Sequence, residues 1–304
     1  ERLVMVEKQK LSGLEIQKIY ELLPGEKLLL MTTKPSAQER FSFIGCKPRA
    51  KLWAKNKKVW LNGELIADKS PFPQLDKWQQ EQTKVWMEKS REEKTIMPFF
   101  MGGVMGFLGY EAYQYVEDIE PHPVDDGNLP DAYFFLFDGF IAYDHMDDCF
   151  YFGLAAQTYN EWVAYHKEIK ALLVLSQSHR GEIREKPYSI SSSLSSEFLP
   201  MSPLLYQKAI ADIKERIALG YTYQVNFSYQ FKGRRSVSPL SVFKQLAQAA
   251  PANQAALLEA QDFAIISASP ERLFSVREGL IHSRPIKGTR RQGKTAAETE
   301  QFIF

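Results

Sequence analysis

Residues 255–283 read AALLEAQDFAIISASPERLFSVREGLIHS, and this stretch decides the fold class. A turn is expected near Glu278 and Gly279. The stretch holds four runs rich in apolar residues, which predict strands at 255–259, 262–267, 271–276 and 280–283. Because these strands follow one another without helices between them, the sequence favours a mixed, largely antiparallel α+β fold over a βαβ repeat. We expect antiparallel sheets packed together with helices outside.

The rest of the chain adds further helices and strands to this picture. Apolar residues recur at helical spacing and predict helices at 13–23, 74–90, 159–175, 204–220 and 239–249. Gly220 stands where the carboxyl-terminal cap of the fourth of these helices is expected. Aromatic and aliphatic runs predict strands at 27–32, 40–45, 98–110, 130–144, 149–155 and 221–231, and a hairpin pattern over 50–66. The turns of this pattern are expected at 55–58 and at Asn62-Gly63, and a turn that includes His145 is expected at 145–148. The glycines inside 98–110 indicate bulges or a close approach between backbones.

A serine-rich stretch divides the chain into two predicted domains. Residues 187–203 hold seven serines and three prolines, a composition typical of a linker. At roughly 150 residues per domain, 304 residues also suggest about two domains. We therefore predict an amino-terminal domain at 1–190 and the first part of a second domain at 200–304.

Composition excludes several classes of function. The 38 basic and 37 acidic residues leave a net charge of +1, which argues against a nucleic-acid binder. No apolar run approaches the ~20 residues of a membrane helix, and the first residues lack a signal-peptide pattern. The two cysteines, Cys46 and Cys149, indicate buried thiols rather than disulfides or a metal cluster. We expect a cytoplasmic protein that acts on neither nucleic acid nor membranes.

One segment near the carboxyl end carries reactive side chains. The common motifs for phosphate loops, nucleophile elbows and paired zinc histidines are absent from the sequence. Residues 284–290 read RPIKGTR, which sets Lys287 between an apolar residue and a glycine. Burial or a neighbouring positive charge could lower the pKa of this lysine and free its amine as a nucleophile. The alternative is an exposed basic turn.

This segment, with several others, resembles the chorismate-utilising enzymes. Ser-Pro-Glu-Arg at 269–272 followed by RPIKGTR is similar to the signature of that family. Other family blocks are matched in the same order, at 40–45 with Pro48, 99–119, 129–145 and 218–231. The resemblance covers the chain from about residue 27 onward and implies the fold of anthranilate synthase component I.

Within the family, the lysine at position 287 makes the chain similar to the aminodeoxychorismate synthases, because anthranilate synthases usually carry alanine at this position. The resemblance implies that chorismate and ammonia from a glutamine amidotransferase subunit give 4-amino-4-deoxychorismate, a precursor of 4-aminobenzoate and folate. It further implies that Lys287 forms a covalent intermediate and that Glu271 handles a proton. Gly288 and Thr289 would bind the substrate. For Glu271, a structural salt bridge to Arg272 or Arg284 is the alternative.

The resemblance also implies two ligands besides chorismate. Family members use Mg²⁺, whose acidic ligands we expect in a segment beyond this chain. Many relatives carry a tryptophan pocket, for which Thr32, Ser42 and Pro251 are the nearest matches. Ala252 stands where some relatives place an aromatic residue, so this pocket could be altered or missing. A further departure is Arg291, where relatives often have proline.

The length of the chain leaves three hypotheses open. The second half of the family's catalytic domain is not matched, so we expect a fragment that does not turn over chorismate alone. The first hypothesis is an aminodeoxychorismate synthase component I. The second is an anthranilate synthase component I, against which Lys287 argues. The third is a non-catalytic remnant that binds an amino acid or an amidotransferase.

Overall fold

The computed structural model describes residues 2–11, 14–37, 39–93, 101–119, 129–178, 201–229, 231, 237–277, 279–286, 293, 295 and 298. The chain forms two compact units. The first consists of residues 1–180 and 239–304, and the second of residues 181–238. Strands of both predicted domains therefore lie in the first unit. The predicted boundary near 190–200 lies outside the described residues, and the division predicted there stays a prediction.

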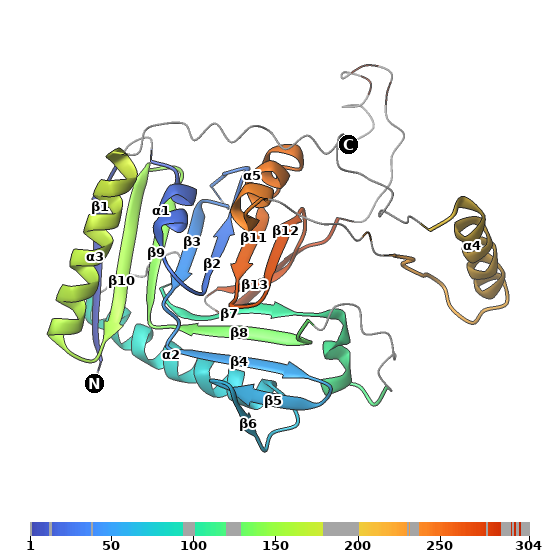
Figure 1. The fold of residues 1–304 in the computed structure, drawn as a ribbon, viewed down its shortest axis with the longest axis horizontal. Coiled ribbons are helices and arrows are strands. Elements are labelled where there is room, and N and C mark those ends of the chain that lie inside the picture. Colours follow the sequence, from blue (N-terminus) through green and yellow to red (C-terminus); the bar gives the residue numbers. More distant parts are fainter. Residues whose placement is uncertain are drawn as a thin grey trace. The chain divides into compact units, whose positions relative to one another are not determined.

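A seven-stranded antiparallel sheet forms the centre of the first unit (Figure 1). Strands from the amino-terminal and carboxyl-terminal parts of the chain meet where β2 (Lys27–Met31) pairs with β11 (Gln254–Glu259), with Leu29 opposite Leu257. The strand order across the sheet is β1 (Leu3–Lys10), β10 (Cys149–Ala156), β9 (Gly139–Asp144), β3 (Phe41–Cys46), β2 (Lys27–Met31), β11 (Gln254–Glu259) and β12 (Ala264–Ser269).

A second antiparallel sheet has five strands. Its hairpin turns contain Asn56, Lys57 and Asn62 at positive φ, as the turn residues of the sequence predicted. A short 3₁₀-helix, Tyr110–Tyr115, follows its edge strand. The strand order is β6 (Glu64–Ile66), β5 (Lys58–Leu61), β4 (Ala50–Lys55), β8 (Ala132–Phe137) and β7 (Gly103–Leu108).

The two sheets pack face to face, and their strands cross in Figure 1. Leu28 and Leu258 of the larger sheet contact Met105, Phe135 and Phe137 of the smaller one in a single buried cluster. Phe135 and Phe137 have no exposed surface. Burying a large side chain contributes roughly 1.5–3 kcal/mol, so this aromatic layer is a principal source of stability.

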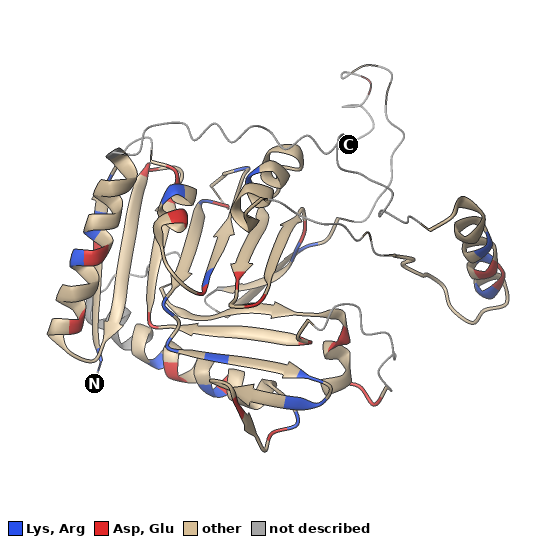
Figure 2. Ribbon diagram, in the orientation of Figure 1, with Lys and Arg blue, Asp and Glu red and all other residues tan. Residues whose placement is uncertain are grey.

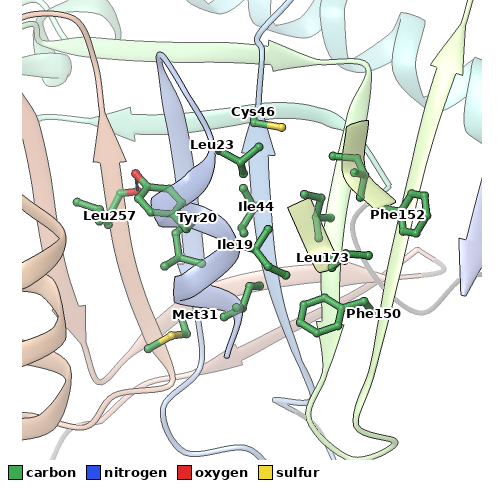
Figure 3. Close-up of a cluster of buried hydrophobic side chains, with 14 of the residues drawn as sticks. Ile19, Tyr20, Leu23, Met31, Ile44, Cys46, Phe150, Phe152, Leu173 and Leu257 are labelled. Atoms are coloured by element: carbon green, nitrogen blue, oxygen red, sulfur yellow. Dashed lines mark hydrogen bonds between the residues drawn. The ribbon is translucent and has the colours of Figure 1, made fainter. Parts of the chain in front are cut away.

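Helices cover the other face of the larger sheet. Figure 3 shows side chains of α1 (Ile16–Leu22), among them Ile19 and Tyr20, packed against Ile44 of β3. The helices α3 (Tyr159–Ser178) and α5 (Pro239–Ala249) contribute to the same core. A fourth helix, α2 (Phe72–Glu93), buries Trp78 against the five-stranded sheet.

The second unit contains α4 (Pro203–Ala218). Ser202 caps its amino end by accepting a hydrogen bond from the Leu205 N–H at 3.2 Å. Gly220 has φ +79° just beyond its carboxyl end, where the sequence predicted a glycine cap. No residue of α4 is buried within the described structure, and its apolar residues Leu204 and Leu205 are 76% and 58% exposed.

Most predicted elements are confirmed, with two corrections. The strand predicted at 221–231 is wrong for the described residues 221–229, which pair with no other strand; Tyr223 is 91% exposed. The single strand predicted over 130–144 is two strands, β8 and β9, which separate at Asp138 and enter different sheets. Both cysteines are free and buried, as predicted.

The charged side chains are distributed unevenly between strands and helices. Figure 2 shows few Lys, Arg, Asp or Glu along the central strands and more of them on helices and at strand ends. Within the described residues, no helix is both long enough and apolar enough to cross a lipid bilayer.

Candidate functional site

The hairpin that leads to Lys287 is formed by β13 (Arg272–Arg277) and β14 (Leu280–Arg284). The two strands are antiparallel and place Arg272 directly opposite Arg284. Gly279 has φ +78° in the connecting turn, where the sequence predicted it. The open end of the hairpin therefore brings the residues before Arg272 and after Arg284 together.

Glu271 lies at this open end. Ser269 Oγ donates to the Glu271 carbonyl oxygen at 3.0 Å and accepts from the Glu271 N–H at 3.3 Å. The Ile286 N–H donates to Glu271 Oε1 at 2.9 Å. The carboxylate is thus bonded to the backbone of the residue that immediately precedes Lys287. The candidates Lys287, Gly288 and Thr289 themselves lie outside the described residues.

Glu39 is a carboxylate at this hairpin that the sequence did not single out. It forms ion pairs with Arg272 and, at 3.6 Å, with Arg284. Gln254 Nε2 donates to the same carboxylate at 3.2 Å. The side chain of Glu39 is only 7% exposed. In the described part of the chain, Arg272 and Arg284 therefore form their salt bridges with Glu39. From the sequence alone, Glu271 is the candidate partner of these arginines.

The proposed tryptophan-pocket residues lie at adjoining strand ends. The Thr32 N–H donates to Ser42 Oγ at 3.2 Å, so these two candidates are in direct contact. Ser42 Oγ also lies 2.6 Å from His145 Nε2. Thr32 is 4% exposed and Ser42 has no exposed surface. We name this group the strand-end cluster and include in it the neighbouring residues Thr33, Ala252 and Asn253.

The loop before β11 completes the strand-end cluster. Thr33 N–H and Thr33 Oγ1 both donate to the Ala252 carbonyl oxygen at 3.0 Å, and the Ala252 N–H donates to Thr33 Oγ1 at 2.7 Å. The third candidate, Pro251, is exposed and directly precedes this contact. The buried atoms Thr32 Oγ1 and Asn253 Oδ1 have no hydrogen-bond partner among the described residues.

An arginine organises the charges beside the strand-end cluster. Arg40 Nε and Nη2 donate to the two carboxylate oxygens of Asp144, each at 2.6 Å, and Arg40 also pairs with Asp147 at 2.8 Å. Burial would raise the pKa of Asp144, but hydrogen bonds from Arg40 and from two backbone N–H groups hold that pKa below its ordinary value. Asp144 therefore stays ionised.

His145 is expected to titrate below its ordinary pKa. Burial lowers the pKa of the imidazole, and the neighbouring Asp144 only partly opposes this. Below about pH 6.5 the unfolded chain then binds more protons at His145 than the folded one, so the free energy of unfolding falls on acidification.

Proton NMR across a pH titration should give a His145 pKa below that of an unfolded-state histidine. His145→Gln keeps a hydrogen-bonding group beside Ser42 but does not titrate. This variant should show a flatter dependence of stability on pH between about pH 7 and pH 5. A His145 pKa at or above the ordinary value would contradict the burial argument.

The described residues do not offer a site that suits Mg²⁺. Asp144, Asp147 and Cys149 bring their ligand atoms within 4.8 Å of one another. Both carboxylates are already paired with Arg40, and burial raises the pKa of the Cys149 thiol. Mg²⁺ prefers six oxygen ligands and does not favour sulfur. No catalytic step is therefore assigned to a metal at this cluster.

Comparison with curated proteins gives relatives of two activities. The chain is 34% identical over 212 residues to aminodeoxychorismate synthase component 1 of Bacillus subtilis, covering 67% of this chain and 43% of that protein. It is 27% identical over 288 residues to anthranilate synthase component 1 of Lactococcus lactis, covering 94% of this chain and 61% of that protein. The chain thus spans about half the length of these relatives.

A solved structure shows the same fold. Anthranilate synthase component I from Streptococcus pneumoniae matches with a TM-score of 0.59 and 24% identity, over 86% of this chain and 57% of that one. This confirms the predicted α+β fold of the anthranilate synthase component I type. The family model described as chorismate binding enzyme matches residues 27–302, nearly the whole sequence. The chain therefore belongs to the chorismate binding enzyme family.

Proposed function

We propose that the protein to which this chain belongs is an aminodeoxychorismate synthase component I that acts in the cytoplasm. It would convert chorismate and ammonia into 4-amino-4-deoxychorismate and water, and so supply 4-aminobenzoate for folate. The Bacillus subtilis relative supports this choice. So does Lys287, since the sequence Pro-Ile-Lys-Gly-Thr at 285–289 resembles that enzyme type.

One observation carries the proposal: Glu271 accepts a hydrogen bond at 2.9 Å from the N–H of Ile286, the residue before Lys287. A carboxylate and an amine held by adjacent backbone can exchange protons through a short path. Lys287 would attack C2 of chorismate while the C4 hydroxyl departs as water, for which Glu271 supplies a proton. Ammonia then adds at C4, the C2–nitrogen bond breaks, and Lys287 is released.

Binding and supply of the reactants complete the proposal. Gly288 would allow the substrate to approach the backbone, and Thr289 would offer a hydroxyl and an N–H to a carboxylate. A glutamine amidotransferase subunit would supply ammonia. Mg²⁺ would neutralise a substrate carboxylate, and we expect its ligands outside the described residues.

We also propose that the strand-end cluster binds an amino acid such as tryptophan. Thr32 Oγ1 and Asn253 Oδ1 are buried without partners among the described residues, and a ligand's ammonium or indole N–H could satisfy them. Calorimetry with tryptophan tests this proposal. We expect binding by the natural protein and its loss in Thr32→Val, which is nearly isosteric.

Product analysis tests the main proposal. The full natural polypeptide, given chorismate, Mg²⁺ and ammonium at alkaline pH, should form 4-amino-4-deoxychorismate, which chromatography separates from anthranilate. Anthranilate as the product would favour the second hypothesis, which the longer match to the Lactococcus lactis protein keeps open. The absence of both products would favour a non-catalytic binding remnant.

A further inference from the structure

We propose that Glu39 is a positioning residue for the reaction, which holds the open end of the β13–β14 hairpin in the geometry that catalysis needs. This inference rests on the proposed function. Glu39 belongs to the loop between β2 and β3, more than 230 residues before the hairpin in the sequence. It reaches both strands of the hairpin through Arg272 and Arg284.

The charges at the open end require a compensating group. Arg272 and Arg284 are directly opposed cross-strand partners, and like charges in such positions repel. The Glu39 carboxylate contacts both guanidinium groups, and Gln254 adds a hydrogen bond at 3.2 Å. One buried carboxylate thus satisfies two arginines, and a buried charge is stable only when it is paired in this way.

Glu39 is itself held firmly from its own side. Its N–H donates to Ser36 Oγ at 3.1 Å, and its carbonyl oxygen accepts from the Ser36 N–H at 3.2 Å. The start of the same loop is tied to the β11 side by the Thr33–Ala252 hydrogen bonds. The carboxylate therefore projects from a short, hydrogen-bonded loop, which makes it a suitable fixed point for the hairpin.

The hairpin has little else to hold it among the described residues. It forms its own two-stranded sheet, and an isolated two-stranded hairpin is marginally stable at best. Leu273 is 79% exposed and Ile281 is 72% exposed. Arg272 adjoins Glu271, and Ile286 lies two residues after Arg284, so a shift of either arginine moves the bond between Glu271 and the backbone before Lys287.

Steady-state kinetics on the full natural polypeptide provide the first test. Glu39→Gln keeps the shape of the side chain and removes its charge. We expect kcat with chorismate and ammonia to fall about tenfold or more with KM changed less than about twofold, since positioning acts on the reacting groups. Glu39→Asp keeps the charge and should recover part of kcat. Glu26→Gln, which removes a half-buried carboxylate bonded to Lys51 and Tyr133, is the matched control and should keep full activity.

A double-mutant cycle separates positioning from a general loss of stability. If Glu39 acts through the arginines, Glu39→Gln combined with Arg272→Gln should lower kcat no further than the more damaging single variant. Additive losses would overturn the proposal. A normal kcat in Glu39→Gln would also overturn it.

Hydrogen exchange supplies a measurement that does not depend on the reaction. In Glu39→Gln the Ile286 amide should exchange at least about tenfold faster than in the natural protein, while amides of β2 and β3 keep their rates. Unchanged exchange at Ile286 would overturn the positioning role whatever the product is. Faster exchange in a protein that makes anthranilate would retain the positioning role and remove only the proposed function.

Discussion

Replacing Lys287 by alanine is expected to lower the rate of 4-amino-4-deoxychorismate formation by about 10³-fold or more. The proposed reaction passes through a bond between the Lys287 amine and C2 of the substrate, and loss of a covalent nucleophile removes the whole two-step route. The measurement is turnover of chorismate with ammonia by the full natural polypeptide, with product separated by chromatography.

A trapping experiment tests the covalent role of Lys287 without measuring turnover. With ammonia omitted, intact mass spectrometry of the natural protein should show an adduct equal to chorismate minus water, and Lys287→Ala should show none. Lys244→Ala, which removes a partly exposed lysine of α5 that pairs with Glu21 of α1, is the control and should keep both the adduct and the activity. Normal turnover by Lys287→Ala would remove the covalent mechanism.

Gly106→Ala is expected to cause the largest loss of stability among single-methyl additions in the five-stranded sheet. Gly106 lies in β7 opposite Phe134 of β8. A Cβ there would overlap the Tyr133 carbonyl oxygen and come within 2.7 Å of Phe134 Cα. Both atoms belong to the backbone, so no side chain can rotate away, and the two strands must separate. We expect a cost of about 3 kcal/mol, at the upper end of overpacking effects.

Gly63→Ala is the matched control for this prediction. Gly63 has φ +89° in the turn between β5 and β6, and an added Cβ there meets nothing within 4 Å. Its cost is the left-handed backbone alone, about 1 kcal/mol. Urea unfolding of both variants measures the difference. Equal losses would contradict the close approach of β7 and β8.

The sequence predicted local structure well where the signal is local. Asn62 and Gly63 predict the turn in which they lie, and Gly220 predicts the end of α4. The glycines of 98–110 predict a close approach between backbones, which the structure shows between Gly106 of β7 and the neighbouring strand β8. These signals depend on backbone conformation or on missing side chains, which are properties of one short segment. The runs in 255–283 gave four strands for the same reason.

The sequence could not predict which sheet each strand joins. The run at 130–144 contains the turn dipeptide Asp138-Gly139, but that local signal does not show that the next strand changes sheet. In the structure β8 ends at Phe137, and β9 begins at Gly139 in the other sheet. Alternation alone favours a strand at 221–231, but a strand requires a partner strand, and the described residues 221–229 pair with no other described strand. Pairing is decided by tertiary packing, which overrides local preference.

The candidate site shows the same division. The motif around Lys287 predicts a role for Glu271 in the site, and the hydrogen bond from the Ile286 N–H places the Glu271 carboxylate next to the backbone that precedes Lys287. Glu39 carries no motif and lies far away in sequence, so only the fold could bring it to Arg272. The sequence predicts a turn at His145, which the structure confirms, but the contact of His145 with Ser42 depends on β3 and β9 being neighbours.

The pairing of β2 with β11 has a consequence for how the chain is made. Met31 and Ala255 are partners, so β2 leaves the ribosome long before its neighbour exists. At roughly 5–20 residues per second, the roughly 220 residues between them take about 10–45 s to synthesise. During that interval the newly made β2 presents an unpaired edge, which can recruit strands of other nascent chains. Recovery of correctly folded protein should therefore depend on translation speed and on chaperones that shield this edge.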